Sequence, residues 1–169
     1  MEKELYDSIT NKSEAGSEEE KKSAGESKSW LIFNCLSDSY AIESSCVREI
    51  LRNNVVFPVP FVPSYVKGVL NFYGKPFAVI DFAQFQDEKP QDSKLFLVLN
   101  NENDVALQIT DIQEFHTSNE NSIQKISSAN ESSYFSGAIN FDNGIKPVVA
   151  PVLNINGILA KIRTDFEIN

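Results

Sequence analysis

The chain has few of the residues from which metal and redox sites are usually built. It contains two cysteines, Cys35 and Cys46, and one histidine, His116. The CxxC, HExxH and DxDxDG spacings typical of zinc and calcium sites do not occur in it. Both cysteines lie among apolar residues with strand character, so we expect buried, reduced thiols, with a disulfide as the alternative. The sequence therefore predicts neither a metal site nor a cofactor.

Long hydrophobic runs are also absent. No stretch of 18 apolar residues occurs, and the first residues, MEKELYDSIT, contain no apolar signal segment. These features predict a cytoplasmic protein with no direct membrane insertion. The formal net charge of -9 and the pI near 4.6 argue against nucleic acid as a partner and against docking on an anionic membrane, since both favour a basic surface.

Composition divides the chain into a tail and a folded part. Residues 1–28 are polar and acidic, with too few apolar groups to offset the entropy of ordering, and are predicted to be a disordered tail. Residues 29–169 are predicted to form the folded domain. The polar connector at 86–93 suggests two subdomains, about 29–90 and about 91–169.

The best-defined local pattern is a hairpin in the first subdomain. Strands are predicted at 69–72 and 77–80, joined by Tyr73-Gly74-Lys75-Pro76, in which the glycine can adopt the unusual dihedral angles of a tight turn. Asp81 is placed to cap a short helix over 82–85. Three prolines before this hairpin predict an extended loop or a sheet edge.

This hairpin sequence occurs twice. The stretch YVKGVLNFYGKPFAVI returns in looser form as YFSGAINFDNGIKPVV. Two hairpins punctuated by glycine can resemble each other by chance, but the matches are many and in order, so we interpret them as two copies of one β unit and expect two similar subdomains. The first matched residues are Tyr65, Gly68, Asn71 and Phe72, which recur as Tyr134, Gly137, Asn140 and Phe141.

The remaining segments also favour short strands. Periodicity leaves 47–51 open between strand and helix. A long polar loop is expected over 116–133, and an amphipathic helix over 152–162 that Gly157 weakens. Many short strands with Gly and Pro turns indicate an all-β, barrel-like fold. The other predicted strands are 30–36, 40–43, 94–99, 105–109 and 112–115.

No catalytic constellation stands out. Carboxylates such as Asp81 and Asp142 fall at turns and strand ends, where aspartate commonly accepts backbone N–H groups, and a small acid–base hydrolase using them is kept only as an alternative. The residues that remain to be explained are large aromatic side chains. An exposed aromatic patch would mark a protein partner, whereas the alternative is that all of them complete the core. The side chains concerned are Phe61, Tyr65, Phe72, Tyr73 and Phe82.

In this order, the motifs resemble those of the CheW-like domain family, the coupling module of bacterial chemotaxis, from about Ser29 to Ile162. The resemblance implies an all-β fold of two five-stranded, SH3-like β-barrel subdomains with short helices, one of them near the C-terminus. The matching motifs are Tyr40-Ala41-Ile42, Val47-Arg48-Glu49-Ile50, Pro58-Val59-Pro60, Lys67-Gly68-Val69, Asn71-Phe72-Tyr73-Gly74, Ala78-Val79-Ile80-Asp81-Phe82, Tyr134 to Gly137 and Asn154 to Leu159.

The resemblance implies a non-enzymatic adaptor with two partners, the cytoplasmic tip of methyl-accepting chemoreceptors and the regulatory domain of the histidine kinase CheA. The alternative is a divergent CheW/SH3-like module that scaffolds a non-chemotactic signalling complex. Gly68 and Gly74 are also open to a purely backbone role. By matched position, the expected protein-binding residues are Val47, Glu49, Gly68, Asn71 and Gly74, with Phe72 and Tyr73 on the same hairpin.

The chain also departs from the family pattern at three positions. Tyr73 replaces the family's arginine, which exchanges a cation with several donors for a flat phenol. Ala78 stands at a usual proline, and Thr110 at a frequent aspartate. These departures predict an unchanged fold and a more aromatic partner surface.

Overall fold

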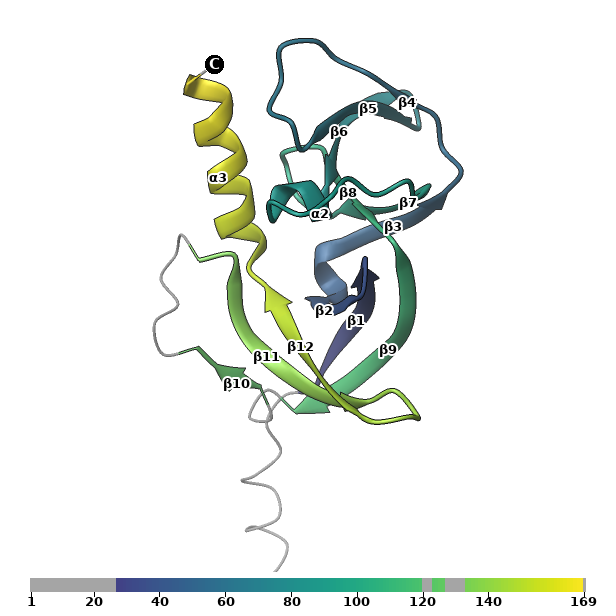
Figure 1. The fold of residues 1–169 in the computed structure, drawn as a ribbon, viewed down its shortest axis with the longest axis vertical. Helices are drawn as coiled ribbons and strands as arrows, with labels where there is room; N and C mark the ends of the chain where they lie inside the picture. The colour runs from purple at the N-terminus through teal and green to yellow at the C-terminus, as the bar shows by residue number, and fades with distance from the viewer. Residues whose placement is uncertain (1–26, 120–122, 127–132, 169) are drawn as a thin grey trace, which may run out of the picture.

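The computed structural model describes residues 27–119, 123–126 and 133–168, which form two β-sheets, two α-helices and one 3-10 turn (Figure 1). The predicted tail, 1–28, lies outside the described residues except for Ser27 and Lys28, which begin the first strand. No helix in the described part of the chain combines the length and apolar character that a bilayer crossing requires.

Sheet A combines the first two strands of the chain with the last four. Its order is β10-β11-β12-β2-β1-β9, and all neighbours are antiparallel except β12 and β2, which meet at Val152 and Ala41. The strands are β1 (Ser27–Cys35), β2 (Asp38–Glu43), β9 (Asp111–Asn119), β10 (Gln124–Lys125), β11 (Phe135–Asp142) and β12 (Pro147–Leu153).

Sheet B is built from the continuous segment between them. Its order is β3-β7-β8-β6-β5-β4, with one parallel pair, β6 and β8. Each sheet thus contains five strands of five or more residues and one two-residue strand, in agreement with two five-stranded barrels. The strands are β3 (Val47–Arg52), β4 (Val56–Phe57), β5 (Val66–Phe72), β6 (Lys75–Asp81), β7 (Leu95–Leu99) and β8 (Val105–Ile109).

The two sheets repeat one pattern of pairing, which confirms the duplication seen in the sequence. β4-β5-β6 in sheet B corresponds to β10-β11-β12 in sheet A, and each unit is followed by a helix, α2 (Phe82–Phe85) or α3 (Ile155–Ile168). Equivalent backbone hydrogen bonds of 2.8 Å run from Asp81 N to Tyr65 O and from Asn154 N to Tyr134 O.

The second copy is completed by the start of the chain. In sheet B the strands β3 to β8 are consecutive, whereas sheet A takes β9 to β12 and then β1 and β2 from the N-terminal side. The division between the sheets therefore does not fall at the expected boundary near residue 90. Sheet B spans 47–109, and sheet A is drawn from 27–43 and 111–153.

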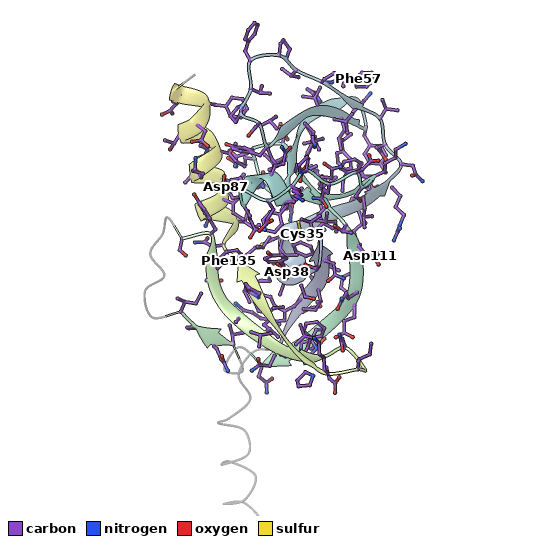
Figure 2. The ribbon with its side chains drawn as sticks, in the orientation of Figure 1. Cys35, Asp38, Phe57, Asp87, Asp111 and Phe135 are labelled. Atoms are coloured by element: carbon purple, nitrogen blue, oxygen red, sulfur yellow. The ribbon has the colours of Figure 1, made fainter. Side chains whose placement is uncertain are left out.

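Three apolar clusters hold this arrangement together. One fills the inside of the barrel formed by sheet A, here called barrel A, around Trp30 and Phe141. A second fills the barrel formed by sheet B, called barrel B, around Phe77 and Phe96. The largest lies between the sheets and includes side chains of both, of α2 and of α3. Figure 2 shows Cys35 and Phe135 in this central region, while Phe57 lies at the opposite end of sheet B. The two barrels are thus packed into one body by an extensive apolar interface.

Several local predictions are confirmed and three are corrected. Residues 47–52 form a strand, which settles the ambiguity there. Cys35 and Cys46 are both free thiols, but only Cys35 is buried as expected, whereas Cys46 is half-buried. The predicted closing helix exists as α3, but it begins at Ile155 because 152–153 end strand β12. The predicted loop over 116–133 is wrong at 116–119, where β9 continues by pairing with β1, and at 124–125, which form β10 and pair with β11.

Candidate functional site

The tight turn between β5 and β6 presents an exposed tyrosine. Tyr73 and Gly74 form a two-residue loop with φ angles of 49° and 87°, as expected for a hairpin in which both turn residues have positive φ. The Asn71 side-chain oxygen accepts a 2.7 Å hydrogen bond from Gly74 N, which fixes the turn. Tyr73 is 83% exposed, so the turn holds an aromatic ring out into solvent.

Strand β3 approaches this turn from across barrel B. The Tyr73 hydroxyl donates a 3.1 Å hydrogen bond to Glu49 Oε1, and the Arg48 guanidinium lies 5.6 Å from the centre of the Phe72 ring. Glu49 and Tyr73, 24 positions apart in sequence, are therefore direct neighbours. With Asn71 and Gly74 they form one surface, which we call the β3–hairpin surface.

The Glu49 carboxylate changes the titration of this tyrosine. Its hydrogen bond and its negative charge raise the pKa of Tyr73, because ionisation would break the bond and place two negative charges side by side. We expect Glu49→Gln to lower the pKa of Tyr73 towards the ordinary value of about 10. NMR titration of ¹³Cζ-labelled tyrosine would measure this change. Glu114→Gln, on strand β9, is the control and should leave the Tyr73 curve unchanged.

Other predicted binding residues are less accessible. Phe72 is only 8% exposed and packs edge-on against Tyr73 and Phe77, with ring centres 4.7 Å and 4.9 Å apart, so it supports the exposed ring from beneath. Val47 is half-buried against the apolar cluster between the sheets. The interpretation of five aromatic residues as one patch is wrong for three of them. Phe61 and Tyr73 are exposed, whereas Tyr65, Phe72 and Phe82 are buried.

Gly68 has a backbone reason to be glycine. Its φ is 140°, and a Cβ atom at this position would lie 2.0 Å from the carbonyl oxygen of Phe57 on β4. The pairing of β5 with β6 shifts register at this point, and the equivalent shift occurs at Gly137 in the other hairpin. Gly68 thus allows β4 to lie close against β5. Gly74, by contrast, has open space around it and owes its identity to its φ of 87°.

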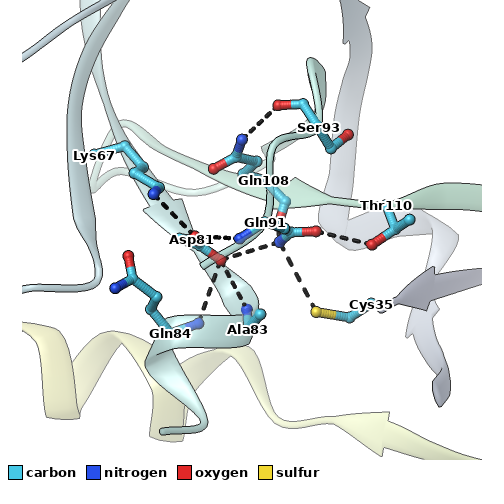
Figure 3. Close-up of polar contacts among 9 residues, drawn as sticks. All are labelled: Cys35, Lys67, Asp81, Ala83, Gln84, Gln91, Ser93, Gln108 and Thr110. Atoms are coloured by element: carbon cyan, nitrogen blue, oxygen red, sulfur yellow. Dashed lines mark hydrogen bonds and ion pairs between the residues drawn. The ribbon is translucent and has the colours of Figure 1, made fainter. Parts of the chain in front are cut away.

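The carboxylate of Asp81 is fully buried in a polar network (Figure 3). It caps α2 by accepting hydrogen bonds from Ala83 N and Gln84 N, at 3.1 Å and 3.3 Å. Gln91 donates to it from both its backbone and its side chain, and the Lys67 ammonium lies 3.2 Å from Oδ2. Because both oxygens are occupied, Asp81 is a structural carboxylate and has no free lone pair for acid–base chemistry.

Gln91 extends this network to the other sheet. Its Oε1 accepts a 2.9 Å hydrogen bond from the Thr110 hydroxyl, whose oxygen in turn accepts a 2.7 Å bond from Leu36 N, between β1 and β2. Its Nε2 also donates to the backbone oxygen of Gln108 at 2.7 Å. Gln91 was missed from sequence because it sits in the polar connector, where side chains are expected in solvent, yet it is only 7% exposed.

The second carboxylate of the hydrolase alternative lies in a different setting. Asp142 is exposed at the end of β11 and accepts a 2.9 Å hydrogen bond from Gly144 N in the next turn. Within the described ranges, no group of three or more His, Cys, Asp or Glu side chains is placed to hold a metal ion. The geometry thus assigns both aspartates to local backbone capping and gives no support to a hydrolytic site.

Comparison with known proteins agrees with this arrangement. The family model described as "CheW-like domain" matches residues 29–163. Among solved structures, the scaffolding protein TtCheW from Thermoanaerobacter tengcongensis is similar, with a TM-score of 0.65 and 20% sequence identity, covering 76% of this chain and 91% of that one. The comparison with curated proteins gave no matching sequence. The family is one of scaffolds rather than enzymes, and because its model spans most of the folded residues, this chain belongs to the CheW-like domain family.

Proposed function

We propose that this chain is a coupling adaptor that joins the cytoplasmic tip of chemoreceptors to the regulatory domain of the histidine kinase CheA, and that it acts in the cytoplasm. Membership of the CheW-like family supports a scaffolding role in general. The pair of exposed Tyr73 and half-buried Glu49 is the observation that carries the finer proposal, because a rigid turn presents both an aromatic face and a hydrogen-bonding edge to a partner.

The β3–hairpin surface suits a modest, repeated contact. Aromatic residues dominate the energy of many interfaces because they bury a large area while losing little side-chain entropy. A single contact of micromolar affinity corresponds to about -8 kcal/mol. Repetition of such contacts in an array would raise the effective affinity further. A barrel-against-barrel contact with the kinase and a helix-in-groove contact with the receptor are the two binding modes we propose.

Replacing Tyr73 should separate binding from folding. We expect Tyr73→Asn to weaken retention of CheA or receptor about tenfold, because a central aromatic contact typically contributes 1–2 kcal/mol or more. Asparagine tolerates the positive φ of this turn, so the melting temperature should change little. Ile145→Asn is a matched control, since Ile145 is 89% exposed in the turn of the duplicated hairpin. Retention that is unchanged by Tyr73→Asn would remove this residue from the contact.

The identity of the partners is tested by co-purification. A tagged full chain expressed in its source cell should recover CheA and methyl-accepting chemoreceptors, identified by mass spectrometry. Recovery of a different signalling assembly without either of them would favour the alternative, a divergent CheW/SH3-like module in a non-chemotactic complex. Tyr73→Arg, which restores the family's usual residue opposite Glu49, should retain the partner if the adaptor role is correct.

A further inference from the structure

A small pocket with both polar and apolar lining lies against barrel B. Its volume is about 430 Å³, large enough for a side chain or a small molecule, and it lies where strands β4, β5, β7 and β8 come together. None of the residues of the β3–hairpin surface contributes to it. The side chains used below are Lys67, Phe96 and Gln108, and the charged side chains of Asp92 and Lys94 also line the pocket.

Gln108 brings an unused acceptor to this pocket. The side chain is only 7% exposed, and its Nε2 donates to the backbone oxygen of Ser93 (Figure 3). This bond fixes the orientation of the amide, since turning it over would set two acceptor oxygens against each other. The remaining atom, Oε1, is buried and has no hydrogen-bond partner among the described residues. An unpaired buried acceptor costs free energy, so it points to a group that can donate to it.

Lys67 brings a fixed donor to the same pocket. Its ammonium lies 3.2 Å from the buried carboxylate of Asp81, and its side chain is 31% exposed. The Asp81 oxygens are otherwise occupied by the α2 cap and by Gln91, so this carboxylate holds the ammonium in one place. An ammonium has three protons, and one contact with Asp81 leaves others for a ligand. Gln108 and Lys67 therefore bring an acceptor and a charged donor to the pocket from strands β8 and β5, which flank β6 in sheet B.

We propose that this pocket binds the carboxamide of an asparagine or glutamine side chain on a protein partner. A carboxamide has an N–H₂ group that can donate to Gln108 Oε1 and a carbonyl that can accept from the Lys67 ammonium. A carboxylate has no proton for Gln108 and would leave this acceptor unpaired, and an ammonium has no lone pair with which to accept from Lys67. The buried ring of Phe96 adds an apolar wall against which the planar amide can lie.

This site would give a partner a second point of attachment that differs in kind from the aromatic contact proposed above. Binding there selects a neutral, planar group and rejects its charged isostere, as sites with buried polar groups generally do. The two proposals can fail separately, because they share no residue: loss of carboxamide binding would leave the effect of Tyr73→Asn unchanged, and the reverse.

The test is an NMR titration of the ¹⁵N-labelled full chain. The probes are N-acetyl-glycyl-glutaminyl-glycinamide, the same peptide with glutamate in place of glutamine, the peptide with alanine there, and free acetamide. We expect the glutamine peptide to shift the Gln108 side-chain amide signals saturably, with a Kd at least tenfold below those of the other two peptides. Its Kd should also lie tenfold below that of acetamide, because neighbouring peptide atoms contact the rim.

Two variants place the effect on the pocket. Gln108→Met removes the acceptor with similar volume and should raise the Kd of the glutamine peptide at least fivefold, followed through the backbone signal of Lys67. Gln113→Met changes a glutamine on β9 and is the control. Equal affinity for the glutamine, glutamate and alanine peptides, or no saturable shift at Gln108, would overturn the proposal. Equal affinity for acetamide and the glutamine peptide would overturn the assignment to a protein partner.

Discussion

Gly68→Ala is expected to destabilise the protein by about 3–5 kcal/mol, because two separate costs act at this position. The backbone has a φ of 140°, a region that residues with a Cβ atom rarely adopt. The new Cβ would lie 2.0 Å from Phe57 O and 2.7 Å from Phe57 C, and these are backbone atoms that move only if β4 leaves β5. Urea unfolding followed by tryptophan fluorescence would measure the loss.

The second hairpin offers graded controls for this substitution. Gly144→Ala changes a glycine with a φ of 80° and open space around it, so only the dihedral cost of about 1 kcal/mol applies. Gly137 is the repeat equivalent of Gly68, and its Cβ would lie 2.8 Å from Gln124 O, so Gly137→Ala should fall between the other two. If Gly68→Ala were no worse than Gly144→Ala, the close approach of β4 would not be the reason for glycine here.

Asp81→Ala should cost about 3–5 kcal/mol, as does the loss of one partner from other buried charged pairs. The substitution leaves the N–H groups of Ala83, Gln84 and Gln91 without their acceptor and removes the anion that holds Lys67. Hydrogen exchange should show faster opening of α2 and of the 86–94 connector before any other part of the folded chain. Urea unfolding gives the total loss of stability.

The matched control is Asp142→Ala, at an exposed position with one backbone hydrogen bond. We expect it to change stability by about 0.5 kcal/mol or less, in line with surface substitutions in general. A similar loss for both variants would mean that the buried network of Asp81 contributes little beyond a helix cap. A gain in stability for Asp81→Ala would mean that burying this carboxylate costs more than its partners return.

The local elements of the fold were predictable because their signals lie within a few residues of one another. The hairpin at Tyr73-Gly74 depends on turn chemistry, and the cap at Asp81 on the residues directly after it. The duplication was visible because each copy needs its own turn, and also its own glycine at the point where the neighbouring strand approaches. Proximity in sequence is therefore sufficient to fix these elements.

Long-range pairing was not predictable in the same way. Nothing in the pattern of β2 indicates that Ala41 lies beside Val152, since this parallel contact depends on how the two sheets close. The same reason explains the errors at the site. Glu49 and Tyr73 meet only because barrel B folds back on itself, and aromatic content alone could not separate exposed Phe61 from buried Phe82. Gln91 is buried because its partners come from distant strands.

The late completion of sheet A has a consequence for biosynthesis. β1 and β2 leave the ribosome first, yet β2 must wait for β12, about 110 residues further along the chain, or roughly 5–20 s at ordinary elongation rates. Sheet B is contiguous and can close during that interval. The nascent chain meanwhile carries the apolar run Leu31-Ile32-Phe33 with no finished sheet to receive it. The hairpin of β1 and β2 is thus the segment on which a holdase chaperone would act.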